Sequence, residues 1–457
     1  MANELGTQAR ALRVAIIGSG PSGFYAAEPL LNSKLNVRVD MFDRLPAPYG
    51  LVRYGVAPDH PKIKNVTKVY EKVATHANFS FMGNVCIGED ISVHELRRYY
   101  DALIFATGAE TDRKLGISGE NFLNSYTATE FVAWYNGHPD FQNRHFDLNH
   151  EVAVIIGQGN VAMDVARILC KTVDELKTTD ITRHALEVLA QSRIKEVHIF
   201  GRRGPVQAAF TPVEIREFGE LADCDPVIDL KELELNEASK TELLDPHNAA
   251  RKKNYEILEE LSKLGNRGKN RKLFLHFYRS PLEIQGANKI ERVVFEKNRM
   301  VGEAGKQKSI GTGEREEFKC GLFFRSVGYR GVPIKGLPFH DQIGIIPNIG
   351  GRVSDAEHIF MGLYTVGWIK RGPSGIIGTN KPDSEETVKN LLEDVDKLLP
   401  CEIPNTEILL EYLREKEIRV INFNDWKKID NAELERGKKY NKSREKFITI
   451  EGMLTAL

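Results

Sequence analysis

The chain has 457 residues, which is enough for two or three domains, each with its own buried core. Its formal net charge of −1 gives no overall field that would attract nucleic acid. No apolar run approaches the roughly 20 residues that a membrane-spanning helix needs, and the hydrophobic content of 41% is ordinary for a globular protein.

A glycine-rich turn follows the first strand-like run. The apolar residues 14–17 lead directly into Gly18-Ser-Gly20-Pro-Ser-Gly23, and a helix-like run comes next. In this context the first glycine makes the tight turn, the second lets the backbone approach a diphosphate, and the third allows close helix–strand packing. The next strand, 37–42, ends at Asp43, whose carboxylate suits ribose hydroxyls and repels a 2′-phosphate. This unit therefore predicts FAD or NAD.

The segment after this strand is predicted to be irregular. Prolines and glycines are dense across residues 45–61, which excludes regular structure there. A long irregular loop beside a nucleotide-binding strand is more often functional than not. The run Asp101–Gly108 reads as a buried strand whose Thr-Gly ending approaches the ligand and marks a domain crossover.

A second glycine turn lies in the middle of the chain. Residues 152–156 are apolar and lead into Gly157-Gln-Gly159-Asn-Val-Ala162. The following strand, 196–200, runs into Arg202 and Arg203. Arginine forms bidentate, charge-assisted hydrogen bonds to phosphate oxygens, so this pair predicts a preference for NADP over NAD. A solvated surface pair is the alternative for the two arginines.

The rest of the chain is less informative. The helix-like run 160–169 carries Asp164, and residues 230–272 are charged and read as an exposed excursion outside the core. A final glycine-rich turn, 372–378, leads into a helix-like run over 383–399, and residues 401–457 read as a charged C-terminal appendage without assigned chemistry.

These elements predict an α/β fold with two Rossmann-like, three-layer nucleotide-binding domains. The NADP domain, residues 113–325, is inserted into a discontinuous FAD domain. That FAD domain consists of residues 1–112 and residues 326–457, the latter including the C-terminal extension.

The cysteines and the N-terminus exclude further classes. The five cysteines lack metal-ligand spacing and form no Cys-x-x-Cys pair, which argues against a metal site and against the dithiol of a disulfide reductase. The N-terminal segment 1–10 is short and polar and carries one acid, Glu4, so it resembles neither a signal peptide nor an organelle transit peptide. Removal of a transit peptide would leave the same sequence.

Several long motifs together resemble adrenodoxin reductase, the mitochondrial ferredoxin–NADP reductase, and its bacterial relatives. The resemblance extends to about residue 395. Its most specific segments are Pro48–Pro61, Gly201–Thr211, Gly367–Gly375 and the loop Trp134–Asp140. One departure is Asp43, where this family usually has Glu; the shorter carboxylate can still hold the ribose through a shifted strand end or a water.

The resemblance implies which residues contact each cofactor. For FAD they are Gly18, Gly20, Ser22, Gly23, Asp43, Leu51, Ile87, Trp368, Gly375, Ile376 and Ile377. For NADP they are Gln158, Gly159, Asn160, Val161, Arg202, Arg203, Glu214 and Gly375. Four residues are expected near the reacting rings: His60, Asp164, Glu214 and Trp368.

Each of these four has a structural alternative. Glu214 either positions the nicotinamide half of NADP or is a carboxylate on a helix surface. His60 and Asp164 either relay protons to the flavin region or form a structural hydrogen bond. Trp368 either packs on the nicotinamide and flavin or is a core aromatic.

The resemblance implies an NADPH:ferredoxin oxidoreductase of the adrenodoxin type. Hydride passes from NADPH to N5 of FAD, and single electrons then pass to an acidic 2Fe-2S ferredoxin that feeds haem monooxygenases or the synthesis of iron–sulfur clusters or haem. The basic residues Arg251, Lys252 and Lys253 are the candidate ferredoxin dock, with a solvated helix face as the alternative. We expect a monomer at the mitochondrial matrix or the matrix face of the inner membrane, a location compatible with peripheral membrane association.

Two other functions fit the paired glycine turns. One is the NADPH-oxidising flavoprotein half of an amidotransferase-type synthase, or a related enzyme of pyrimidine or glutamate metabolism. Such proteins usually add N-terminal cysteine clusters, which this chain lacks. The other is a non-catalytic NADP sensor that keeps FAD as a structural element, against which the intact segment Trp368–Gly375 argues.

Overall fold

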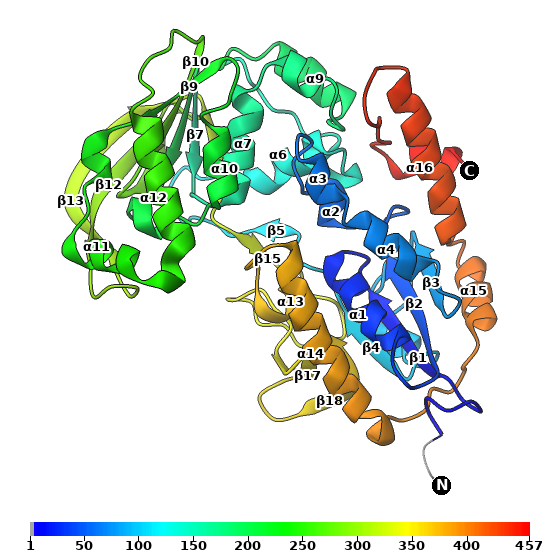
Figure 1. Ribbon diagram of the computed structural model, residues 1–457. Helices are drawn as coiled ribbons and strands as arrows, with labels where there is room; N and C mark the ends of the chain where they lie inside the picture. The colour runs from blue at the N-terminus through cyan, green and yellow to red at the C-terminus, as the bar shows by residue number, and fades with distance from the viewer. Residues whose placement is uncertain (1–3) are drawn as a thin grey trace. The chain divides into compact units, whose positions relative to one another are not determined.

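The computed structural model describes residues 4–457, which form two compact units (Figure 1). Among the described residues, unit 1 comprises 4–111, 136–140 and 328–457, and unit 2 comprises 112–135 and 141–327. Unit 2 is thus an insertion between two halves of unit 1. The short strands β5 (Thr111–Asp112) and β15 (Tyr329–Arg330) lie where the chain passes between the units.

Unit 1 is built on a seven-stranded sheet of order β16-β17-β18-β4-β1-β2-β3. Strands β18, β4, β1, β2 and β3 are parallel, and β16 and β17 join them as an antiparallel edge. The strands are β1 (Leu12–Ile17), β2 (Val37–Asp43), β3 (Phe79–Gly83), β4 (Ala102–Phe105), β16 (Asn348–Ile349), β17 (Arg352–Ser354) and β18 (Ile359–Thr365). The helices are α1 (Pro21–Leu31), α2 (Leu51–Tyr54), α3 (Pro61–Lys64), α4 (Thr67–Ala74), α5 (Val93–Leu96), α13 (Trp368–Arg371), α14 (Asn380–Glu393), α15 (Thr406–Glu415), α16 (Phe423–Lys438) and α17 (Ile450–Thr455).

Both faces of the unit 1 sheet are buried, which explains why β1 is apolar at almost every position. Val14 and Ile16 point into one cluster, which also contains side chains of α1, α14 and α16. Ala15 and Ile17 point into a second cluster, which includes side chains of α15. Successive residues of a strand face opposite sides, so a strand in the middle layer of three needs an unbroken apolar run.

The C-terminal segment is part of this core, so its interpretation as an appendage was wrong. Trp426 and Ile429 of α16 are fully buried in the cluster beneath β1. The Arg53 guanidinium donates to both oxygens of Glu433, at 2.9 and 2.5 Å, and lies 5.0 Å from the Trp426 ring centroid. Amphipathic α16 is thereby joined to α2, 380 residues earlier in the chain. The many charged residues of α16 obscured this role, because composition alone does not show which face of a helix is buried.

Unit 2 contains a six-stranded, fully parallel sheet of order β6-β14-β7-β8-β10-β9. Its strands are β6 (Ser125–Thr127), β7 (Val152–Ile156), β8 (Glu196–Phe200), β9 (Cys224–Ile228), β10 (Arg271–His276) and β14 (Leu322–Arg325). A second, antiparallel sheet consists of β11 (Arg279–Gln285), β12 (Arg292–Val301) and β13 (Lys308–Lys319). The helices are α6 (Ala128–Tyr135), α7 (Asn160–Cys170), α8 (Val173–Leu176), α9 (Arg183–Ala190), α10 (Pro212–Glu217), α11 (Glu237–Leu244) and α12 (Ala249–Ser262).

The large sheet of unit 2 is the middle of three layers. Ala153 and Ile155 face a cluster formed with the helices, in which α10 and α12 are neighbours (Figure 1). Val154 and Ile156 face the opposite cluster, formed with Val293 and other residues of the antiparallel sheet. The fold is therefore two Rossmann-like, three-layer domains, as predicted.

The segment 230–272 does not lie outside this core, which corrects the prediction of an exposed excursion. Ile257, Leu258 and Leu261 of α12 are buried in the helix-side cluster of unit 2. They recur at helical spacing among charged residues, so one face of α12 packs and the other stays in solvent.

The loop after β2 is more regular than its composition suggests. Tyr49 has a φ of +86° and Gly50 a φ of +49°, and the chain then forms α2 and, after His60, α3. Residues 136–140, which the sequence places in the central domain, group with unit 1. The His138 ring lies 4.8 Å from the Tyr54 ring, and Asp140 pairs with Arg44 at 2.7 Å.

Two further features complete the fold. All five cysteines are free, and Cys170 and Cys224 adjoin each other in the core of unit 2, where burial raises the pKa of Cys170 well above its usual value. No sequence pattern predicts this contact, because the two residues are far apart along the chain. Across residues 4–457, no helix is both long and apolar enough to cross a membrane.

Replacing Glu433 with Gln should strongly destabilise unit 1. Glu433 is fully buried and also accepts a hydrogen bond from Arg444 at 3.0 Å. Removing its charge leaves two arginines without this carboxylate, and breaking a buried ion pair costs about 3–5 kcal/mol. Urea unfolding followed by tryptophan fluorescence measures this loss.

Glu435→Gln on the same helix is the matched control. Glu435 pairs with Lys438 at 2.6 Å, but both side chains are well exposed. Its loss should cost less than about 1 kcal/mol. Equally small effects of the two substitutions would contradict a structural role for α16.

Candidate functional site

Parallel strands place the candidate site residues of unit 1 at one edge of its sheet. The chain leaves β1 at Gly18, β2 at Asp43 and β18 at Val366, and all three points lie at carboxyl ends of parallel strands. This edge is where open α/β sheets bind nucleotides.

The first glycine turn leaves a helix N-terminus open. Gly18 has a φ of +110°, and a Cβ there would collide with the carbonyl oxygen of Ala106 on the neighbouring strand. Gly20 is the N-cap of α1, which no side chain caps, and a Cβ at Gly20 would meet no protein atom within 4 Å. Protein packing therefore requires the first glycine but not the second. An uncapped helix N-terminus beside open space fits a diphosphate.

The carboxylate at the end of β2 is held against this turn. Asp43 accepts hydrogen bonds from the N–H of Ser19 at 3.1 Å and from the N–H of Leu45 at 2.9 Å, and also from the Ser19 hydroxyl. Burial raises the pKa of Asp43, while these hydrogen bonds act in the opposite direction. The structure thus places Asp43 next to the turn, where it can reach a ribose bound along α1.

Two other predicted flavin contacts lie around the same edge. The N–H of Tyr49 donates to the carbonyl oxygen of Ser19 at 3.0 Å, which brings Leu51, the first residue of α2, close to the glycine turn. Ile87 follows β3 and packs in the cluster that includes Ile17 and Phe42.

The segment 367–377 completes this group of residues. A Cβ at Gly367 would lie 2.6 Å from the Ser22 side chain, so the turn that begins with Gly367 contacts the start of α1. Trp368 is half-buried, its Nε1 donates to the carbonyl oxygen of Ser374 at 3.1 Å, and its ring lies 5.3 Å from that of Tyr329. It is therefore not a core aromatic. Ile376 exposes 61% of its surface.

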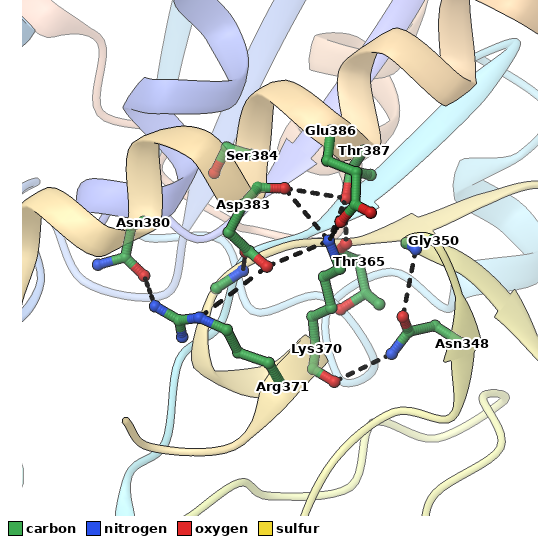
Figure 2. Close-up of polar contacts among 12 residues, drawn as sticks. Asn348, Gly350, Thr365, Lys370, Arg371, Asn380, Asp383, Ser384, Glu386 and Thr387 are labelled. Carbon is green, nitrogen blue, oxygen red and sulfur yellow. Dashed lines mark hydrogen bonds and ion pairs between the residues drawn. The ribbon is translucent and has the colours of Figure 1, made fainter. Parts of the chain in front are cut away.

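A buried lysine fixes this segment to α14 (Figure 2). Lys370 is 7% exposed, and its Nζ lies 3.1 Å from Asp383 Oδ1 and 2.7 Å from Glu386 Oε2. The other Asp383 oxygen accepts a hydrogen bond from the N–H of Gly367 at 2.6 Å. Asp383 thus holds both ends of α13. The sequence analysis missed this pair, and its only signal was a lysine within an otherwise apolar and glycine-rich run.

The second glycine turn, in unit 2, repeats the first. Gly157 has a φ of +124°, and a Cβ there would collide with the carbonyl oxygen of Ser326 at the end of β14. Gly159 is the uncapped N-cap of α7, and a Cβ there would meet no protein atom within 4 Å.

The residues beside Gly159 are fixed by side-chain contacts. Gln158 donates to the carbonyl oxygen of His276 at 2.9 Å, and Asn160 accepts from the N–H of Thr211 at 2.9 Å. Val161 is partly buried against the helix-side cluster. These contacts orient the start of α7 without closing the open space above Gly159.

Arg202 and Arg203 follow β8 at the same edge and are both exposed. In the part of the chain that the structure describes, neither guanidinium has a hydrogen bond or an ion pair within the protein. The carbonyl oxygen of Arg202 accepts from Ser309 Oγ at 2.6 Å and from Asn298 Nδ2 at 2.9 Å, so the antiparallel sheet holds the turn. Two unpaired guanidiniums on a fixed turn fit the 2′-phosphate of NADP.

Asp164 and Glu214 are joined by an arginine that the sequence analysis did not single out. Arg167 is 1% exposed, and it donates to Asp164 at 2.5 Å and to Glu214 at 3.0 Å. Glu217 lies 3.2 Å from the same guanidinium. Glu214 is therefore buried in an ion network and is not a carboxylate on a helix surface. Arg167 lies one helical turn after Asp164, a spacing that could have revealed this pair.

His60 lies in unit 1, immediately before α3, whereas Asp164 lies in unit 2. The predicted interaction between them stays a prediction. The roles of the individual cofactor contacts also stay predictions. The glycine turns and the residues beside them lie at one sheet edge in each unit.

Comparisons with known proteins agree with two nucleotide-binding units. A family profile described as pyridine nucleotide-disulphide oxidoreductase matches residues 12–207. The chain is 43% identical to the NADPH-ferredoxin reductase FprA of Mycobacterium tuberculosis, over 96% of this chain and 98% of that protein. It is 42% identical to the mitochondrial NADPH:adrenodoxin oxidoreductase of Arabidopsis thaliana, over 98% of this chain and 95% of that protein. The solved structure of M. tuberculosis FprA in complex with NADPH superimposes with a TM-score of 0.92 at 42% identity, covering 98% of this chain and 99% of that one.

Replacing Gly159 with Ala should weaken NADP binding and leave the fold intact. The backbone φ of −99° at Gly159 is accessible to alanine, and the methyl group meets no protein atom, so the free energy of unfolding should change by less than about 1 kcal/mol. The methyl group would occupy the surface that the diphosphate approaches, so the Kd for NADP should rise at least about tenfold. Calorimetric titration and urea unfolding measure the two quantities. An unchanged Kd would place the diphosphate elsewhere.

Proposed function

This chain belongs to the family of NADPH-ferredoxin and adrenodoxin reductases, and we propose that it is an FAD-dependent NADPH:ferredoxin oxidoreductase. One observation carries the proposal. The two glycine turns have the same geometry, but one is followed by a half-buried carboxylate and the other by two exposed arginines that, among residues 4–457, form no ion pair. This difference suits FAD on unit 1 and NADP on unit 2.

Bound FAD would supply the conversion of a two-electron hydride donor into single electrons for an iron–sulfur ferredoxin. The protein contributes binding and orientation. Gly20 and the start of α1 would bind the FAD diphosphate, and Asp43 would bind its ribose. Leu51 and Ile376 would cover apolar parts of the flavin. Gly159 and Asn160 would bind the NADP diphosphate, and Arg202 and Arg203 would donate hydrogen bonds to its 2′-phosphate.

In this proposal, four side chains act near the nicotinamide and flavin rings: Glu214, His60, Asp164 and Trp368. Glu214 orients the nicotinamide half of NADP, and Arg167 holds the Glu214 carboxylate in place. His60 and Asp164 form the polar pair near the flavin. Trp368 covers the nicotinamide and flavin region, and its hydrogen bond to Ser374 fixes the plane of the indole.

The ferredoxin partner is proposed to bind the basic face of α12. Lys252 is exposed and, within residues 4–457, has no ion pair, whereas Lys253 pairs with Glu256 at 3.1 Å. Exposed lysines attract an acidic ferredoxin and raise its association rate in a salt-dependent way. Arg251 differs from its neighbours because the carboxylate with which it forms an ion pair, Glu242, is buried.

The proposal includes a monomer at the matrix side of the inner mitochondrial membrane. Relatives named as mitochondrial proteins in Arabidopsis thaliana and Homo sapiens support that location. The mycobacterial relatives are equally similar, so a bacterial cell is the other compartment that fits. The electrons would feed haem monooxygenases or the synthesis of iron–sulfur clusters or haem.

Anaerobic titration of the flavin spectrum tests the nucleotide assignment. The purified protein should be bleached by low concentrations of NADPH and only by much higher concentrations of NADH. Replacing both Arg202 and Arg203 with Gln should reduce this preference at least about tenfold, because it removes the charged donors to the 2′-phosphate. Arg193→Gln, an exposed arginine of the same unit, is the matched control. Equal response of the unmodified protein to the two nucleotides would contradict the proposal.

Charge reversal at Lys252 tests the dock. At low salt, Lys252→Glu should raise the KM for ferredoxin several-fold, and the effect should shrink as ionic strength rises. NADPH-dependent ferricyanide reduction should not change, because ferricyanide does not need the dock. Lys263→Glu, an exposed lysine at the other end of α12, makes the same charge change and is the control. Equal effects of the two variants would place the dock elsewhere.

A further inference from the structure

A buried carboxylate lies directly behind the arginine turn of unit 2. Glu242 on α11 is 2% exposed. Its Oε2 accepts hydrogen bonds from Gln207 Nε2 at 3.1 Å and from the N–H of Gly305 at 3.3 Å, and its Oε1 forms an ion pair with Arg251. The carboxylate thus joins three separate segments of the chain.

These contacts connect Arg251 to the turn of Arg202 and Arg203. Gln207 closes the short 3₁₀ helix Pro205–Gln207, which follows Arg203 after a single glycine, and its N–H donates to the carbonyl oxygen of Gly204 at 3.1 Å. Helix α12, which carries Arg251 in its first turn, packs against this 3₁₀ helix. Glu242 contacts Gln207 with one oxygen and Arg251 with the other, so it fixes Arg251 beside the turn.

We propose that Arg251 is a third cation for the 2′-phosphate of NADP, that Glu242 is its positioning residue, and that Arg251 is not part of the ferredoxin dock. This inference rests on the proposed function, because it requires that unit 2 binds NADP. It divides the basic run 251–253 into a nucleotide-binding residue and two partner-binding residues.

The charges around the turn support a bound anion. The pKa of Arg203 lies below its usual value, first because of burial and then because of the charges of Arg202 and Arg251. Three guanidiniums near one another repel, and a phosphate monoester with a charge of about −1.5 to −2 offsets that repulsion. Glu242 neutralises part of the charge of Arg251, but it lies on the buried side, and 42% of the Arg251 side chain remains exposed.

Helix geometry separates Arg251 from its neighbours. Consecutive residues of a helix point about 100° apart, so Arg251 and Lys253 point to nearly opposite sides of α12, with Lys252 between them. Arg251 points to Glu242, whereas Lys253 pairs with Glu256 of its own helix. A run that looks like one basic patch in the sequence therefore serves two surfaces.

The first experiment compares two probes that differ only in the 2′-phosphate, 2′,5′-ADP and 5′-AMP. Each is titrated calorimetrically into the FAD-loaded protein. Arg251→Gln should raise the Kd for 2′,5′-ADP about tenfold and leave the Kd for 5′-AMP unchanged. The KM for NADPH in ferricyanide reduction should rise with little change in kcat, and the KM for ferredoxin should not move. Lys263→Gln, with the same charge change on the same helix, should affect none of these quantities.

A second variant guards against misfolding, because Arg251→Gln leaves Glu242 buried without its cation. The double variant Arg251→Gln with Glu242→Gln removes both charges and keeps the net charge. It should show the same loss of 2′,5′-ADP affinity. The single variant Glu242→Gln should cause a smaller loss, because Arg251 keeps its charge but loses its fixed position.

The possible results separate this inference from the function on which it rests. If the unmodified protein binds 2′,5′-ADP no better than 5′-AMP, the NADP assignment of unit 2 is overturned, and this inference with it. If the unmodified protein discriminates and the double variant does so equally well, only the role of Arg251 is overturned. A raised KM for ferredoxin with unchanged 2′,5′-ADP affinity would return Arg251 to the dock.

Discussion

The whole structure depends on one backbone constraint, which is the close approach of a turn to the neighbouring strand at the carboxyl edge of a parallel sheet. At Gly18 and at Gly157 the next strand's carbonyl oxygen occupies the place of a side chain. Only glycine satisfies this approach together with a positive φ. The turn then delivers the uncapped N-terminus of α1 or α7 to that edge. Asp43 and the turn at Gly367 contact the first of these helix ends, and Gln158 and Asn160 form the start of the second.

The two units use this geometry differently because their sheets are covered differently. In unit 1 the outer helix α14 holds the segment 367–377 through Lys370 and Asp383, and α16 holds the loop at Arg53. These buried ion pairs fix apolar turns that can cover a flat ring system. In unit 2 the side chains of Asn298 and Ser309, on the antiparallel sheet, donate hydrogen bonds to the backbone carbonyl oxygen of Arg202 and so hold its turn in place. Backbone support of this kind leaves the guanidiniums free to meet an anion.

The sequence was sufficient wherever the chemistry is local. The strand–glycine–helix pattern predicts both nucleotide turns, and β7 and β8 have the predicted bounds. For β7 the reason is an unbroken apolar run, which indicates burial on both faces. The sequence was insufficient wherever a role depends on a distant partner. Glu433 on α16, Arg167 on α7 and Glu242 on α11 look like ordinary charged residues of amphipathic helices. Only the fold shows that each is buried against an opposite charge on another helix: Glu433 against Arg53, Arg167 against Glu214, and Glu242 against Arg251. The same limit explains why residues 401–457 read as an appendage.

The division of cations on α12 has a consequence for how salt affects the two binding events. Lys252 is exposed, and its attraction to an acidic partner acts across water, where ions at physiological strength screen charges beyond about 8 Å. Arg251 is held by a buried carboxylate and acts at hydrogen-bond range, where screening is weak. Raising ionic strength should therefore weaken the encounter with ferredoxin well before it weakens recognition of the 2′-phosphate. One helix can in this way keep its nucleotide bound while its protein partner exchanges, because its cations differ in burial rather than in sign.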